Sequence, residues 1–168
     1  MLNMSKIEAG ELDLKPQQFD ISEMLFMTLL SFEQVIESKH IEIKGLDTIQ
    51  PNFLTADKDM INQVVYNLVD NAVKFTPEGG YIEVSSKADS EKIILKIKNS
   101  GKGIPSDEID KIFERFYRED KARSRGTGGN GLGLSIAKTI VSDMKGKITV
   151  EHNVPKGTKF IIVFPKSK

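Results

Sequence analysis

The stretch that decides the fold is DMINQVVYNLVDNAVKFT, residues 59–76. Its apolar side chains recur at three- and four-residue steps, which predicts a helix over residues 57–75 with one core-facing side. That apolar stripe consists of Ile61, Val64, Val65, Leu68 and Ala72. Asn67, Asn71 and Lys74 form a second, polar stripe beside it. We therefore expect a helix that packs on the core and carries a polar edge.

The two asparagines on one helix face point to a binding role. Asparagine costs about 0.5 kcal/mol or more against alanine inside a helix. The Asn71 carboxamide oxygen is a hard, neutral ligand of the kind that Mg²⁺ accepts beside triphosphate oxygens and water. Asn67 would then position water or phosphate one turn earlier, and Lys74 would meet phosphate charge one turn later. The structural alternative is a pair of buried amides that cap neighbouring backbone groups.

Hydrophobic periodicity predicts the elements on either side of this helix. The predicted helices cover residues 21–37, a short segment that Ser106 caps, and residues 132–144. The predicted strands cover residues 40–44, 81–86, 92–98, 148–150 and 159–164. Pro16 ends or excludes a helix near Lys15, so residues 1–16 are interpreted as the end of a preceding helix.

The turn NSGKGIP, residues 99–105, combines a polar side chain with two glycines. Gly101 and Gly103 permit a backbone path closed to other residues, so a flat ligand can approach the main chain there. Asn99 has an acceptor and donors, and it could accept a hydrogen bond from an adenine amino group, less strongly than a carboxylate. An ordinary hairpin-like turn is the alternative.

The most specific element is GTGGNGLGLSIAKTI, residues 126–140, in which five glycines directly precede an amphipathic helix. Unpaired amide N–H groups and the positive end of the helix dipole favour phosphate at such a site. The spacing fits neither the Walker loop nor the dinucleotide-binding glycine motif. A flexible linker is the alternative, although a linker has little need to run directly into a strong helix.

Between the two glycine elements lies IFERFYREDKARSR, residues 112–125, which is rich in basic and aromatic side chains. Basic groups beside a triphosphate stabilise its charge, and the glycines on one flank make the segment a candidate lid. We expect Arg118 to contact phosphate. A solvated charged loop with core phenylalanines is the alternative.

Composition narrows the class of protein. The 168 residues suit one domain, and 24 basic against 24 acidic residues give no general attraction to nucleic acid or anionic membrane. The absence of cysteine excludes disulfides and thiolate chemistry and fits a reducing, cytoplasmic setting. The sequence contains neither a signal peptide nor an apolar run long enough to span a bilayer. A soluble domain is therefore expected.

In this order, the motifs resemble those of the catalytic, ATP-binding domain of sensor histidine kinases, in the ATPase superfamily shared with gyrase, heat-shock chaperone and mismatch-repair ATPases. Residues 59–76 resemble the N box, NSGKGI the first glycine box, IFERFYR the phenylalanine box and GNGLGLSIAK the second glycine box. The resemblance covers about residues 17–168 and makes residues 1–16 the remnant of a dimerisation and histidine-phosphotransfer helix.

The resemblance implies a fold and a set of site residues. The fold is an α/β arrangement, an α+β two-layer sandwich of the Bergerat type, with a mixed sheet of about five strands and three helices on one face. Asn71 is implied as the Mg²⁺ ligand, and the implied catalytic residues are Asn67, Asn71, Lys74 and Arg118. The implied ATP-binding residues are Asn71, Lys74, Phe75, Asn99, Gly101, Gly103, Ile104, Phe113, Tyr117, Arg118, Gly129, Asn130, Gly131, Leu132 and Gly133.

Two positions depart from the family pattern. Aspartate is usual where this chain has Asn99, which puts the strongest adenine contact in doubt, and tyrosine is common where it has Phe75. The phosphorylatable histidine lies outside the chain, so the isolated chain is expected to be a monomer that binds ATP and transfers nothing. The expected partners are its own dimerisation domain and a response regulator receiver domain, with any membrane contact made through the full-length parent.

Two other functions remain open at the level of sequence. A water-activating ATPase of the same superfamily resembles this chain except for a glutamate where Asn67 stands, and an amide cannot act as a general base. A module that senses nucleotide without catalysis is the second alternative, and Asn99 is the feature that favours it.

Overall fold

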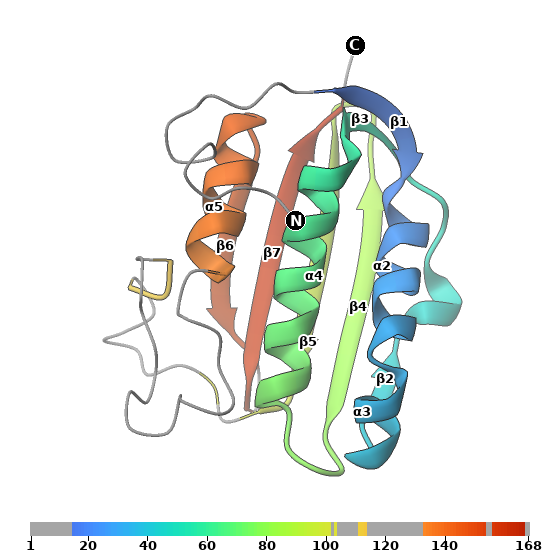
Figure 1. Ribbon diagram of the computed structural model, residues 1–168, viewed down its shortest axis with the longest axis vertical. Helices are drawn as coiled ribbons and strands as arrows, with labels where there is room; N and C mark the ends of the chain where they lie inside the picture. The colour runs from blue at the N-terminus through green and yellow to red at the C-terminus, as the bar shows by residue number, and fades with distance from the viewer. Residues whose placement is uncertain (1–14, 102, 104–110, 114–132, 154–155, 167–168) are drawn as a thin grey trace.

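The computed structural model describes residues 15–101, 103, 111–113, 133–153 and 156–166. Figure 1 shows two layers, with the helices gathered on one face of a twisted sheet. The elements in chain order are β1 (Pro16–Asp20), α2 (Ile21–Ser31), α3 (Glu33–Ser38), β2 (Glu42–Lys44), the 3₁₀ turn η1 (Leu46–Thr48), β3 (Phe53–Asp57), α4 (Lys58–Phe75), β4 (Tyr81–Ala88), β5 (Lys92–Asn99), α5 (Gly133–Asp143), β6 (Lys147–His152) and β7 (Thr158–Pro165).

The main sheet has five strands in the order β2-β4-β5-β7-β6. β2 pairs with β4 in parallel, and the other neighbours pair antiparallel, so the sheet is mixed. Helix α4 crosses the middle of the covered face, between α2 and α5 (Figure 1). This arrangement confirms the two-layer fold and the five-stranded mixed sheet that the sequence resemblance implied.

The core forms between α4 and alternate residues of the central strands. Helix α4 buries Met60, Ile61, Val64, Val65, Leu68, Val69, Ala72 and Val73. The buried positions are Ile93, Leu95, Ile97 and Asn99 in β5, and Thr158, Phe160, Ile162 and Phe164 in β7. Each fully buried Val, Leu, Ile or Phe contributes roughly 1.5–3 kcal/mol, so these apolar rows hold the layers together. The buried positions of β5 finish at the polar residue Asn99, and those of β7 begin at the polar residue Thr158.

Both ends of α4 are capped by side chains. At the start, the Asp57 carboxylate accepts hydrogen bonds from the backbone N–H groups of Asp59 at 3.1 Å and Met60 at 3.2 Å. At the finish, Lys39 Nζ donates to the carbonyl oxygen of Val73 at 2.9 Å. A cation beside the last carbonyls of a helix complements its dipole. Burial lowers the pKa of Lys39, because desolvation disfavours the ammonium form.

Two features differ from the sequence prediction. β1 pairs with β3 as a separate antiparallel ribbon, although PQQFD shows no strand pattern and buries only Phe19. The predicted helix over residues 21–37 is two helices, because the chain bends at Phe32, whose φ of −102° and ψ of 13° are not helical. The Phe32 ring packs against Tyr66 of α4, with centroids 5.3 Å apart. Within the described residues, no helix is long and apolar enough to cross a bilayer.

Candidate functional site

The polar stripe of α4 lies at the rim of its buried face, as the sequence predicted. Asn67 and Asn71 are both half-buried, and the Asn67 carboxamide oxygen accepts a hydrogen bond from Gln63 Nε2 at 3.1 Å. No hydrogen bond joins the Asn71 carboxamide to another residue within the described parts of the chain. Asn71 is therefore outside the apolar interior and has polar atoms to offer a ligand.

Lys74 extends the same stripe, one turn after Asn71. Its ammonium lies 3.0 Å from Asp70 Oδ2, and the two side chains are 34% and 26% exposed. Partly exposed ion pairs of this kind typically contribute about 1 kcal/mol or less. Lys74 therefore forms a weak ion pair with Asp70 of its own helix. An anion that bound to Lys74 would have to displace only that carboxylate. Its contact with phosphate stays a prediction.

The C-terminal end of α4 packs directly on the glycine turn that follows β5. A Cβ atom added to Gly101 would lie 2.2 Å from the carbonyl oxygen of Phe75, so only glycine allows this approach. Gly103, two residues later, has a positive φ of 86°. The Phe75 side chain itself is 50% exposed. The turn therefore packs against the backbone at the end of α4, and the last residue of that helix, Phe75, has a half-exposed side chain.

Asn99 ends the buried row of β5 beside this turn and is only 6% exposed. Its Oδ1 accepts a hydrogen bond from the backbone N–H of Thr158, its partner in β7, at 3.1 Å. The Nδ2 atom lies on the Gly101 side, 3.2 Å from the place a Cβ of Gly101 would take. The structure thus brings Asn99 and Gly101 together, and it adds Thr158, which the sequence analysis did not name.

Two further residues complete this cluster and were also not predicted. Gly157 has a φ of 117°, and a Cβ there would lie 1.8 Å from the Asn99 carbonyl oxygen. Asn153 Nδ2 donates to Tyr81 Oη at 2.9 Å and to the same Asn99 carbonyl at 3.2 Å. In the sequence, NVPKGT is an ordinary hairpin turn, and nothing in it shows that β7 pairs with β5. Only that pairing identifies Gly157 as part of the site.

Phe113 is the described member of the phenylalanine box. It is half-buried, its ring meets Phe160 of β7 edge-on with centroids 6.4 Å apart, and Lys138 Nζ lies 5.5 Å from its centroid. Phe113 therefore packs at the edge of the core on the α5 side. Its role in binding nucleotide stays a prediction.

Of the remaining predicted site residues, the structure describes Gly133 alone. Gly133 is the first residue of α5, which begins toward the end of the sheet where α4 finishes and runs antiparallel to it (Figure 1). A helix start carries partial positive charge, so α5 is oriented to favour an anion on that side. The predicted residues outside the described ranges are Ile104, Tyr117, Arg118, Gly129, Asn130, Gly131 and Leu132, together with the short helix after Ser106.

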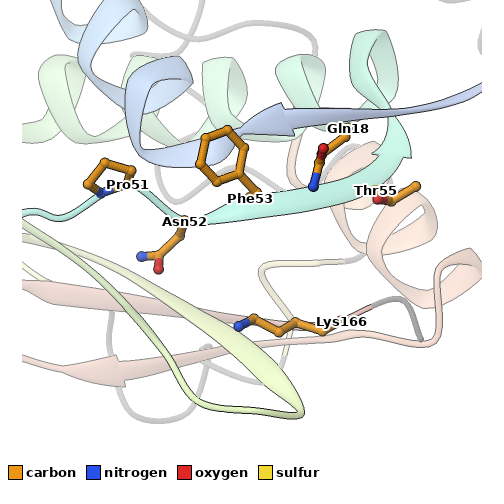
Figure 2. Close-up of a pocket in the computed structure, with 6 residues that line it drawn as sticks. All are labelled: Gln18, Pro51, Asn52, Phe53, Thr55 and Lys166. Carbon is orange, nitrogen blue, oxygen red and sulfur yellow. The ribbon is translucent and has the colours of Figure 1, made fainter.

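A hollow lies at the opposite end of the sheet from the glycine turn. Figure 2 shows it between the β1–β3 ribbon and Lys166, which follows β7. Its volume is about 360 Å³, and it is lined by Gln18, Pro51, Asn52, Phe53, Thr55 and Lys166. Asn52 Nδ2 already donates a hydrogen bond to Ser86 Oγ at 2.7 Å, so this amide group has a partner within the protein. This hollow contains none of the predicted site residues, and we place the candidate site at the glycine turn instead.

Comparison with known proteins agrees with the fold. The family of histidine kinase-, DNA gyrase B-, and HSP90-like ATPases matches residues 56–168. The sensor protein CiaH of Streptococcus pneumoniae is 37% identical over 160 residues, which cover 95% of this chain and 35% of CiaH. The chain therefore belongs to this ATPase family, as a catalytic domain of the sensor histidine kinase type.

Solved structures place the chain in the same group. The catalytic domain of histidine kinase ThkA superimposes with a TM-score of 0.78 at 32% identity, covering 90% of this chain and 96% of that one. Full-length ShkA in complex with AMPPNP gives a TM-score of 0.80 at 25% identity, covering 97% of this chain and 34% of that one. ThkA has also been solved in complex with the response regulator protein TrrA. The chain spans about a third of the length of CiaH.

Proposed function

We propose that this domain binds ATP with Mg²⁺ and donates the terminal phosphoryl group to a histidine on a separate dimerisation domain. The observation that carries the proposal is the Asn71 carboxamide, half-buried at the rim of α4 with no hydrogen bond to another described residue. It lies one helical turn before the point where Phe75 meets the glycine turn. A hard amide oxygen in this place suits a metal bridged to phosphate.

The described residues fit a nucleotide. Gly101 and Gly157 let this turn pack closely against the carbonyl oxygens of Phe75 and Asn99, because a Cβ at either position would collide with backbone. The half-exposed Phe75 ring offers a face on which a flat base can pack. Asn99 is buried at the end of β5, beside the same turn. A planar base bound beside the half-exposed Phe75 ring would lie next to the end of α4, whose polar stripe carries Asn71 and Lys74.

In the proposed reaction the nucleotide supplies the phosphoryl group, and the protein positions it and neutralises its charge. Asn71 would hold Mg²⁺, and Lys74 would leave Asp70 to meet phosphate oxygens. The accepting histidine would be supplied by the separate dimerisation domain. The ShkA complex with AMPPNP supports the nucleotide, and the ThkA complex with TrrA supports onward transfer to a response regulator.

Asn67 argues against hydrolysis as the main activity. Activation of water needs a group that can take up a proton, and a carboxamide cannot do so. The Asn67 oxygen instead accepts a hydrogen bond from Gln63 Nε2 at 3.1 Å. A positioning role therefore suits Asn67 better than the role of a general base.

The metal role is tested by Asn71→Ala. We expect Mg²⁺-dependent affinity for an ATP analogue to fall by about tenfold or more, because a direct metal ligand is lost. Asn62→Ala is the matched control, since Asn62 is an exposed asparagine on the same helix. Isothermal titration with and without Mg²⁺ measures the effect, and urea unfolding checks the fold. Equal affinity in both variants would remove Asn71 from the metal site.

Phosphoryl transfer is tested by adding a histidine-bearing dimerisation domain in trans. An acid-labile phosphohistidine on that domain is the expected product. Tight nucleotide binding without any transfer would favour the nucleotide-sensing module instead. Steady phosphate release by the chain alone would favour the water-activating ATPase.

A further inference from the structure

The face of the main sheet that points away from the helices is rich in lysine. Strands β4, β5 and β7 bury alternate residues under the helices, so the residues between them point to the other side of the sheet. Figure 1 shows the described helices on the opposite side, and we call the uncovered side the open face. Six lysines of β4, β5, β6 and β7 lie on it: Lys87, Lys92, Lys96, Lys98, Lys147 and Lys159.

The open face is basic, although the whole chain has no net charge. The same four strands place two acidic residues there, Glu83 and Glu151. The edge strand β2 adds Glu42 and Lys44, whose charges cancel. Six lysines and two glutamates give the four strands a net charge of +4 on this face. Composition predicted no general attraction to an anionic surface, but the sheet sorts the charges and creates a local attraction.

Acidic groups offset part of this charge at the two ends of the open face. At the glycine-turn end, Lys98 Nζ lies 3.8 Å from Glu83 Oε1, and Lys159 Nζ lies 3.0 Å from Glu151 Oε1. These two lysines are therefore already paired within the protein.

At the other end, the turn between β4 and β5 adds Asp89 and Glu91, and Lys166 follows β7. The Asp89 carboxylate accepts hydrogen bonds from the backbone N–H groups of Glu91 at 2.8 Å and Lys92 at 2.9 Å. Backbone hydrogen bonds hold the pKa of Asp89 below its usual value, so the carboxylate stays charged. With these three residues the face keeps a net charge of +3.

The lysines in the middle of the open face have no acidic partner. Lys96 and Lys147 form no ion pair with another residue in the described parts of the chain. Lys96 lies opposite Ile161, and Lys147 lies opposite Val163, which is also the partner of Ile94. The three apolar residues are half-buried, and the lysine stems can lie along them while the ammonium groups reach outward.

This arrangement matches an extended anionic surface better than a single anion. Neighbouring strands lie about 4.8 Å apart, so lysines on four adjacent strands spread over roughly 15 Å across the sheet. None of the residues in these four strands is an arginine, the side chain whose planar fork best recognises individual phosphates in nucleic acid. A second copy would bring a face of the same charge. Headgroups of a lipid bilayer offer a continuous anionic array above an apolar layer.

We propose that the open face is a membrane-docking surface that binds anionic phospholipid headgroups. The inference is independent of the nucleotide site. Docking on this face would leave the helix layer, with Asn71 of α4, pointing away from the lipid (Figure 1). The sequence analysis expected membrane contact only through a longer parent protein, and this surface would give the domain a contact of its own.

The experiment measures binding of the chain to lipid vesicles by co-sedimentation. One set of vesicles contains equal parts of phosphatidylglycerol and phosphatidylcholine, and the other contains phosphatidylcholine alone. The test variant is the double substitution Lys96→Gln and Lys147→Gln. The matched control is Lys58→Gln with Lys138→Gln, because these exposed lysines belong to the helices on the other side and the change in net charge is the same.

We expect the wild type to bind the anionic vesicles and not the neutral ones, with affinity that falls as salt is raised. Each lysine near an anionic membrane is worth about fivefold in affinity, so the test variant should bind about twentyfold more weakly. In about 0.1 M salt, charges more than about 10 Å from the lipid are screened, so the control variant should bind like the wild type. Thermal melts check that both variants fold.

Three results would overturn the proposal. Absence of wild-type binding to anionic vesicles rejects the surface outright. Equal losses in the test and control variants would mean that net charge acts and that the open face does not. If soluble polyglutamate or duplex DNA binds the wild type while the vesicles do not, the face serves an acidic macromolecule and not a membrane. Titration with an ATP analogue is a separate measurement, so failure here leaves the proposed function standing.

Discussion

Polar side chains at the two ends of the covered sheet face differ in whether other protein groups hydrogen-bond to them. At the β1–β3 end, the buried Ser86 hydroxyl lies 2.9 Å from Ser22 Oγ and accepts from Asn52 Nδ2 at 2.7 Å. At the glycine-turn end, neither the Asn99 Nδ2 atom nor the Asn71 carboxamide has a hydrogen bond to another described residue.

This difference separates structural polar groups from those available to a ligand. Buried polar atoms are normally hydrogen-bonded, because an unpaired one loses its contact with water without compensation. The cluster at Ser86 satisfies that rule with protein atoms alone, so it needs no ligand. Donors left over at the other end are most simply explained by a molecule that completes them.

The largest effect is expected for Gly157→Ala. Its φ of 117° is unfavourable for alanine, and the new Cβ would lie 1.8 Å from the Asn99 carbonyl oxygen. We expect the free energy of unfolding to fall by about 3 kcal/mol or more, with loss of nucleotide binding. Urea unfolding and titration with an ATP analogue measure the two effects.

Gly79→Ala is the matched control for this substitution. Gly79 also has a positive φ, of 79°, but a Cβ there meets nothing within 4 Å. We therefore expect the free energy of unfolding to fall by about 1 kcal/mol, from backbone strain alone. Equal losses in the two variants would mean that strain alone matters and that the close packing around Asn99 does not.

A smaller effect is expected at the opposite end for Ser86→Ala. The substitution removes the acceptor of Asn52 Nδ2 and should lower the free energy of unfolding by about 1–2 kcal/mol. Nucleotide affinity should stay the same, whereas Asn71→Ala should change affinity and leave stability alone. Unfolding and titration curves for both variants test the contrast. Weaker nucleotide binding in Ser86→Ala would show that the two ends are coupled.

The smallest effect is expected for Lys39→Met, which removes the hydrogen bond from Nζ to the Val73 carbonyl oxygen at the end of α4. At neutral pH we expect the free energy of unfolding to fall by about 0.5–1 kcal/mol, from the loss of this hydrogen bond. Because burial lowers the folded pKa of Lys39, the unfolded chain binds more protons at alkaline pH. The stability of the wild type relative to the variant should therefore rise as pH increases through the lowered pKa. Paired urea unfolding at neutral and alkaline pH checks this, and a difference that shrinks with pH contradicts it.

Some features of the fold could be predicted from local patterns, and others could not. The helix over residues 57–75 and the strands of β4 and β5 were predicted because their apolar positions repeat with the period of one element. The strand β1 was missed because its polar sequence has one buried residue and pairs with β3 far along the chain. The bend at Phe32 was missed for a related reason, since Phe32 packs against Tyr66 of another helix.

The sequence by itself determined the long helix α4, the strands β4 and β5, the polar stripe at Asn67 and Asn71, and the glycine turn, because each depends on neighbours within a few positions. The tertiary structure alone decided how the Asn99 carboxamide is oriented. That choice depends on the N–H of Thr158, 59 positions away, which reaches Asn99 only through the pairing of β5 with β7. An asparagine can accept or donate, and only its three-dimensional partner selects between them.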